Sequence, residues 1–210
     1  MIYTDEKIDE LRQKVEMSMS EKRFFHTAEV EKMAERLGNL YVPDKILMLR
    51  AAALLHDITK EKSTEQQLEL LKKNGVKITP IDAISPKTLH AKTAEYVIRD
   101  EFSEFYGDPE LLDCVRKHTT GDAQMTICEM IIYLADYIDM SRKFDDCVKL
   151  REYFWGKDPE KMGEKEKYNH LLKTLILSFD MTLCALIEEG SPISRQSVDA
   201  RNAMICNLKA

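Results

Sequence analysis

The histidines of this chain lie beside carboxylates in several short segments, and they are the residues most able to do chemistry. Four of the five histidines belong to this set, and His56 is followed directly by Asp57. Imidazole and carboxylate ligands together suit divalent metals such as iron, manganese or zinc. The set is large enough for two ions if one cavity collects its members, which are His26, His56, Asp57, His90, His118 and Asp136. A metal-dependent hydrolase is therefore the leading hypothesis.

His56 and Asp57 form the sharpest local signal, because they end the apolar run at residues 51–55. Adjacent side chains on a helix project about 100° apart, so both can reach into one wide cleft. Lys60 follows one turn later, where its ammonium could meet an anionic ligand. For the dipeptide alone, a hydrogen-bonded polar helix end is an equally good interpretation.

The other candidates are weak when each is taken alone. A single histidine on an apolar helix face, such as His26 or His90, is more often a packed core residue than a ligand. Asp136 follows an apolar run, where a carboxylate needs a cation or several donors to offset its desolvation; a helix end turned toward solvent is the alternative. Because the set occupies five predicted helices, its convergence on one bundle interior is best explained by metals.

The elements that must position these residues are expected to be helices throughout. The chain has only 7 glycines and 6 prolines, and its apolar residues recur with helical periodicity. Start signals are Ser18 with Glu21, Pro43, Asp108-Pro109 and Asp158-Pro159. Helices are predicted at about 64–73, from Thr126 onward, from 158 to about 190 and at 196–207, with a connection at 77–86. The predicted fold is an all-α globular bundle with its ligand site between facing helices.

Length and charge limit the classes of function. A chain of 210 residues fits one domain, residues 1–210. A net charge of -6 argues against broad nucleic-acid binding, although a local basic pocket for a phosphorylated small molecule is compatible with it. Five cysteines without a CxxC pair indicate buried free thiols in a reducing compartment.

No membrane partner is expected, and the location that follows is cytoplasmic. The first residues lack the apolar stretch of a signal peptide, and the apolar segment 175–187 is short for a bilayer and contains Asp180. Its extended stripe, 171–187, is predicted to be core, with a homodimer interface as the alternative. His170 lies among polar residues and is predicted to be at the surface or partly exposed.

The ordered motifs resemble those of the HD-domain metal-dependent phosphohydrolase superfamily. Within it, the chain is most similar to the YqeK-like symmetrical bis(5′-nucleosyl)-tetraphosphatases. An HD dipeptide alone is weak, but its combination with HTTG at 118–121 and YLADYI at 133–138 is specific. The resemblance covers about residues 18–145 and leaves about 146–210 as a C-terminal helical part of the same domain.

The resemblance implies cleavage of diadenosine tetraphosphate into two ADP. It also implies two divalent metals, with iron favoured and manganese or another divalent metal as the alternative. The first would be bound by His26, His56, Asp57 and Asp136, and the second by His90 and His118, with Asp57 bridging. A hydroxide shared by the two metals would be the nucleophile. Asp57, Arg23 and Lys60 would be catalytic, and the phosphate site would be lined by Arg23, Lys60, Thr119, Thr120, Gly121 and Arg142.

Three segments depart from the pattern of the family. Residues 92–95 lack a proline and a glycine found in many relatives, and Asp139-Met-Ser-Arg142 replaces the usual Glu-Pro-Asn-Arg. Residues 122–124 replace a basic, glycine-containing turn, so that Asp122 places a negative charge near a polyphosphate. No proposed ligand is lost, and the substrate is therefore less strongly specified than the metal site.

Two other functions stay open. One is a phosphohydrolase of other nucleotides or deoxynucleotides, which would release phosphate or pyrophosphate instead of two nucleoside diphosphates. The other is a non-catalytic nucleotide-binding module on an HD scaffold. Degenerate modules usually lose ligands, whereas this chain keeps the whole set, and the enzyme is therefore favoured.

Overall fold

The computed structural model describes residues 3–209, and every regular element within them is helical. The helices are α1 (Asp5–Ser18), α2 (Glu21–Tyr41), α3 (Ile46–Leu55), α4 (Thr64–Lys73), α5 (Pro80–Ile84), α6 (Leu89–Glu101), α7 (Ser103–Tyr106), α8 (Pro109–Lys117), α9 (Ile127–Ile138), α10 (Asp145–Trp155), α11 (Glu164–Glu188) and α12 (Arg195–Lys209). Short 3-10 turns lie at Pro43–Lys45, Pro86–Thr88 and Pro159–Lys161. The all-α prediction is confirmed.

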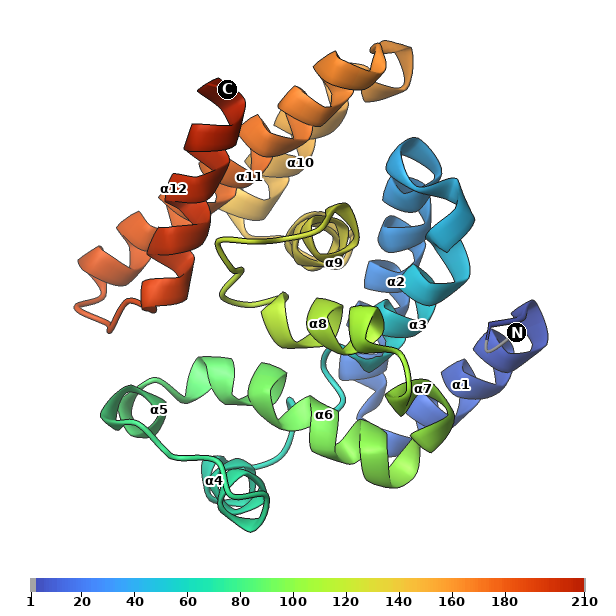
Figure 1. The fold of residues 1–210 in the computed structure, drawn as a ribbon, viewed down its shortest axis with the longest axis vertical. Helices are drawn as coiled ribbons and strands as arrows, with labels where there is room; N and C mark the ends of the chain where they lie inside the picture. The colour runs from blue at the N-terminus through green and yellow to red at the C-terminus, as the bar shows by residue number, and fades with distance from the viewer. Residues whose placement is uncertain (1–2, 210) are drawn as a thin grey trace.

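The core forms around two apolar helices, α3 and α9. Helix α3 is buried from Ala51 to Leu55, and α9 is buried from Cys128 to Ala135. Helices α2 and α8 pack against both of them. Figure 1 shows α9 end-on near the centre, with α10, α11 and α12 on one side and α4 to α6 on another. A carboxylate or imidazole at the ends of these central helices is therefore held by well-packed backbone.

Helix starts follow local capping chemistry, with two corrections. The Thr126 side chain and Glu129 form a capping box at α9, and Asp108 caps α8 as predicted. The cap of α2 is Ser20, whose hydroxyl accepts from the Arg23 amide, whereas Ser18 is the last residue of α1. The chain after Asp158 first forms the 3-10 turn, and α11 begins only at Glu164.

Three further expectations need correction. The segment 77–86 contains the short helix α5, which Thr79 and Asp82 cap reciprocally. His170 is buried, because its ring stacks on Phe154 and its Nε2 lies 2.9 Å from the Phe154 carbonyl oxygen. All five cysteines are free, but Cys184 and Cys206 are exposed, so burial holds for only three of them.

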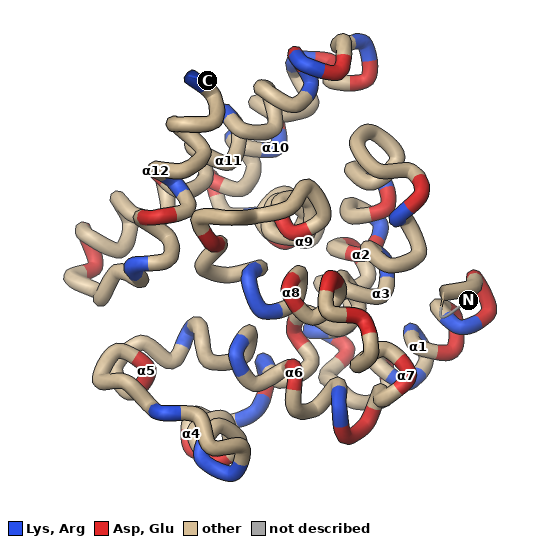
Figure 2. The backbone as a smooth tube through the Cα atoms, in the orientation of Figure 1, with Lys and Arg blue, Asp and Glu red and all other residues tan. Residues whose placement is uncertain are grey.

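Helix α11 is the one described helix that is long and apolar enough to cross a membrane by length and composition. Its 25 residues extend beyond the segment 175–187, so length alone does not exclude a span, contrary to our expectation. It packs against α9, α10 and α12, and core helices pass the same test, so this is weak support for a membrane segment. Figure 2 shows acidic and basic residues interspersed over the visible helices.

Candidate metal centre

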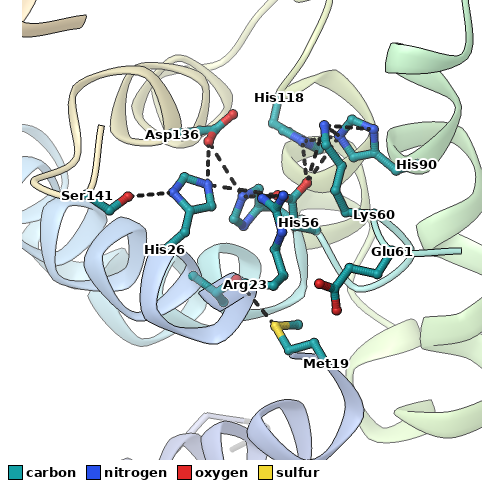
Figure 3. Close-up of polar contacts among 12 residues, drawn as sticks. Met19, Arg23, His26, His56, Lys60, Glu61, His90, His118, Asp136 and Ser141 are labelled. Atoms are coloured by element: carbon teal, nitrogen blue, oxygen red, sulfur yellow. Dashed lines mark hydrogen bonds and ion pairs between the residues drawn. The ribbon is translucent and has the colours of Figure 1, made fainter. Parts of the chain in front are cut away.

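The six predicted ligands meet between five helices, as the sequence indicated. His26 comes from α2, His56 and Asp57 follow α3 directly, and Asp136 lies on α9. His90 lies in the first turn of α6 and His118 directly follows α8. Figure 3 shows the four histidines and Asp136 pointing toward one another. The four histidines and Asp57 are buried, and the Asp136 side chain is 16% exposed.

Asp57 lies at the middle of the cluster, and its two oxygens face different partners. Oδ2 lies 3.5 Å from His56 Nε2 and 3.8 Å from His26 Nε2. Oδ1 lies 3.2 Å from His90 Nε2 and 3.7 Å from His118 Nε2. One carboxylate thus separates two groups of ligand atoms, each tight enough for an ion.

Asp136 completes the first group. Its Oδ1 lies 3.0 Å from His26 Nε2 and 3.7 Å from His56 Nε2. In the second group the Nε2 atoms of His90 and His118 are 3.0 Å apart. Two ring nitrogens this close can share one hydrogen or one metal cation, and the negative charge of Asp57 beside them favours a bound positive charge.

Two histidines have their tautomer fixed by the backbone. His56 Nδ1 lies 2.6 Å from the Ala53 carbonyl oxygen, and His118 Nδ1 lies 2.6 Å from that of Val115. A carbonyl can only accept, so each Nδ1 carries a hydrogen and each Nε2 presents its lone pair to the cluster. This is how proteins orient histidines that bind metals.

The electrostatics of the cluster favour ionised carboxylates. Burial would raise the pKa of Asp57, but the facing histidines and Lys60 hold it well below its usual value. Burial would also raise the pKa of Asp136, and Arg142 with two histidines lowers it. Burial, together with His118, lowers the pKa of His90, which keeps that ring neutral.

The pKa of His26 is shifted in the opposite direction from that of His90. Burial alone would lower its pKa, but the close carboxylates of Asp136 and Asp139 outweigh burial and raise the pKa to about 9. Metal ligands must be deprotonated, so a cation has to displace one proton from this ring.

Three buried ligand atoms in the cluster, His26 Nε2, His56 Nε2 and Asp57 Oδ1, form no hydrogen bond within the described structure. Unsatisfied buried polar atoms are rare because each costs free energy. Divalent cations coordinated by these atoms would satisfy them, and the imidazole and carboxylate donors suit iron, manganese or zinc. The residues present therefore fit a divalent metal site.

The three cations predicted to bind phosphate lie at the edge of the cluster and pair with its carboxylates. Arg23 Nη1 donates to Asp57 Oδ2 at 2.7 Å, and Arg142 Nη2 donates to Asp136 Oδ1 at 2.5 Å. Lys60 Nζ lies 3.2 Å from His90 Nε2, and burial lowers the pKa of the Lys60 ammonium. About a quarter to a third of each side chain is exposed, so each can also meet a ligand from solvent.

Thr119 and Thr120 lie elsewhere, in the walls of two adjoining cavities of about 450 and 230 Å³. None of the six candidate ligands lines either cavity, whereas Asp122 lines the larger one. Their substrate contacts stay a prediction.

Gly121 has a structural role in the fold, and its predicted phosphate contact stays a prediction. Its amide donates to the Lys117 carbonyl at 2.8 Å, so the amide is not free for a phosphate. A Cβ atom at this position would lie 2.6 Å from Phe179, so the absent side chain allows close packing.

Asp139 and Ser141 were not assigned a role from the sequence. Asp139 is fully buried, and Ser141 Oγ lies 2.9 Å from His26 Nδ1. The only available signal was their place in the segment that replaces Glu-Pro-Asn-Arg. The local sequence does not show that this segment folds against α2.

Comparison with known proteins agrees with this geometry. The HD domain profile matches residues 23–141. The symmetrical bis(5′-nucleosyl)-tetraphosphatase of Bacillus subtilis is 27% identical over 85% of this chain and 87% of the relative. That of Halalkalibacterium halodurans is 28% identical, over 94% of this chain and 96% of the relative.

A crystal structure from Clostridium acetobutylicum has the same fold. It is described as a predicted HD superfamily hydrolase involved in NAD metabolism, and it superposes with a TM-score of 0.80 at 28% identity. The alignment covers 95% of this chain and 97% of that one. These findings confirm the resemblance noted from the motifs, and the chain belongs to the HD-domain family of hydrolases.

Proposed function

We propose that this protein is a dinuclear metal-dependent phosphohydrolase that cleaves dinucleoside tetraphosphates symmetrically, with diadenosine tetraphosphate giving two ADP. The observation that carries the proposal is the split of Asp57 between two groups of histidines, 3.2 to 3.8 Å from its oxygens. The names of the relatives support the substrate, since curated relatives of matching length are symmetrical tetraphosphatases.

In this proposal His26, His56, Asp57 and Asp136 hold one divalent cation, and His90 and His118 hold the second with Asp57 shared. Iron is the metal that the family favours, and manganese suits the same ligands. When bound, two such cations acidify water and neutralise phosphate charge.

The residues at the edge then act on the substrate. Arg23 offers a planar fork for two phosphate oxygens, and Lys60 offers a compact charge. Both stabilise negative charge that grows on the transferring group and on the leaving oxygen. Arg142, which pairs with Asp136, is the third phosphate contact, and Thr119 and Thr120 would contact a more distant part of the substrate.

Product analysis tests the proposal. Anaerobically purified protein is loaded with Fe²⁺ or Mn²⁺, its metal content is measured, and products from diadenosine tetraphosphate are separated by chromatography. About two metals per chain with ADP as the sole nucleotide product is the expected result. AMP with ATP would contradict symmetrical cleavage, and loaded protein that binds the nucleotide without turnover would favour a binding module.

A second candidate is a phosphohydrolase of other nucleotides. Two observations favour it: Asp122 lines the same cavity as the basic residues Arg116 and Lys117, and the solved relative is described as involved in NAD metabolism. Release of inorganic phosphate or pyrophosphate from a mononucleotide or pyridine dinucleotide, faster than ADP from diadenosine tetraphosphate, would select it.

A further inference from the structure

The turn after α9, residues 139–142, lies against the outer edge of His26, on the side away from Asp57. We propose that Asp139 is a positioning residue which, together with Ser141, fixes His26 for metal binding. This inference rests on the proposed metal centre and goes beyond the ligands assigned to it. Asp139 lies close enough to His26 and Asp136 to be a ligand itself, but it faces Nδ1 of His26, whereas Nε2 of that ring is turned toward Asp57.

Hydrogen bonding around Asp139 determines the direction of each contact. The Ser141 amide donates to Asp139 Oδ1 at 2.8 Å, and the Ser141 hydroxyl donates to the same oxygen. Because its hydrogen is used there, Ser141 Oγ can only accept from His26 Nδ1, which lies 2.9 Å away. His26 therefore carries a hydrogen on Nδ1, and its Nε2 is the atom turned toward Asp57 and Asp136.

The second oxygen of Asp139 adds negative charge beside the same ring. Oδ2 lies 3.4 Å from His26 Nδ1 and 3.5 Å from Arg142 Nε, and it forms no hydrogen bond in the described structure. A carboxylate next to the outer nitrogen of a histidine orients the ring and raises its basicity as a ligand. Asp139 is 0% exposed, so this interaction is only weakly screened by solvent.

The turn is held rigidly enough for this purpose. Arg151 of α10 donates through Nε to the Ile138 carbonyl at 2.7 Å and through Nη2 to the Arg142 carbonyl at 2.9 Å. Its Nη2 also donates to the Asp139 carbonyl. Arg142 in turn donates to the Asp136 carbonyl at 2.9 Å. One turn thus fixes both His26 and Asp136, which belong to the same ion.

His26 is the ligand most open to such a test. His56 and His118 are oriented by backbone carbonyls, which substitution cannot remove. His26 depends on two side chains, Asp139 and Ser141, that are not among the six proposed ligands. Changing them should weaken the ion held by His26 and leave the ion held by His90 and His118 in place.

The test compares wild type, Asp139→Asn and Asp145→Asn by equilibrium dialysis against Mn²⁺, metal analysis and electron paramagnetic resonance. Asp145 is an exposed acid in the first turn of α10, so its change alters charge without touching His26. Wild type and Asp145→Asn should bind two coupled ions. Asp139→Asn should bind one tightly and the other roughly 10- to 100-fold more weakly, with the spectrum of isolated Mn²⁺.

Circular dichroism of the metal-free variants separates positioning from folding. If Asp139→Asn fails to fold, Ser141→Ala, at a half-buried position, removes the direct acceptor and should weaken the same ion. Two ions bound as in wild type by whichever variant folds would overturn the inference. Failure of wild type to bind Mn²⁺ at all would instead overturn the proposed metal centre, so the two failures are distinct.

Discussion

Replacing Gly121 with alanine is expected to destabilise the protein well beyond the usual effect of a glycine substitution. Gly121 has a φ of +64°, and a Cβ built on it would lie 2.6 Å from Phe179 Cζ and 3.1 Å from the Ala200 Cβ. The left-handed conformation costs an alanine about 1–2 kcal/mol. Overpacking a rigid core costs about 1–3 kcal/mol more, and Phe179 has little room to move because it is fully buried and stacked on Tyr133. The expected loss of unfolding free energy is therefore about 2–5 kcal/mol.

Gly75→Ala is the matched control. Gly75 has a φ of +72° but nothing within 4 Å of its added Cβ, so only the conformational cost of about 1–2 kcal/mol applies. Urea unfolding of both metal-free variants gives the two losses, and their difference isolates the packing of Gly121 on Phe179. Equal losses would refute this reasoning. A Gly121→Ala protein as stable as wild type but inactive on diadenosine tetraphosphate would restore the phosphate role predicted from the sequence.

Three other predictions concern the site and one helix cap. Asp57→Ala should lower turnover by on the order of 10³-fold or more and loosen both ions while the helical circular dichroism is kept, and an active variant would exclude the bridging role. Mn²⁺ at 100 times its dissociation constant should raise the unfolding free energy of wild type by about 2.7 kcal/mol per ion, measured by urea unfolding, and a metal-independent midpoint would contradict the site. Burial would raise the pKa of Asp82, but Lys92 and Thr79 lower it below its usual 3.8. The cap that Asp82 forms on α5 should therefore hold above pH 4 and weaken as the pH falls further. The NMR shift of the Thr79 amide, which donates to Asp82, should titrate below pH 3.8. A titration midpoint above pH 3.8 would contradict the contact.

The convergence of the candidate ligands was predictable because each of them lies at an end or on the inner face of a helix. His56 and Asp57 end a run that is buried from Ala51 to Leu55, so their position at the core edge follows from hydrophobic pattern alone. Asp136 similarly lies within the most apolar helix of the centre. In such places a polar group needs a specific partner, and the sequence shows the need even though it does not show the partner.

The errors arose where local signals competed. Ser18 and Ser20 are both good N-cap residues, and only the position of the boundary between α1 and α2 selects Ser20. His170 was judged by its polar sequence neighbours, but it shares a helix face with Leu171, Thr174 and Ser178, all of which are buried. The periodicity of the buried face was the better guide there.

The roles of Arg23, Lys60 and Arg142 could not be decided in the same way. A basic side chain near a predicted metal site suits either a phosphate or a ligand carboxylate, and pattern does not distinguish these partners. In the structure Arg23 binds Asp57, which lies in a separate part of the chain. Arg142 binds Asp136, which lies only six residues before it. An arginine that already neutralises a ligand carboxylate becomes available to a phosphate when a cation takes over that carboxylate. The same residues can therefore pair with ligand carboxylates and contact a phosphate, and the sequence prediction and the observed ion pairs are compatible.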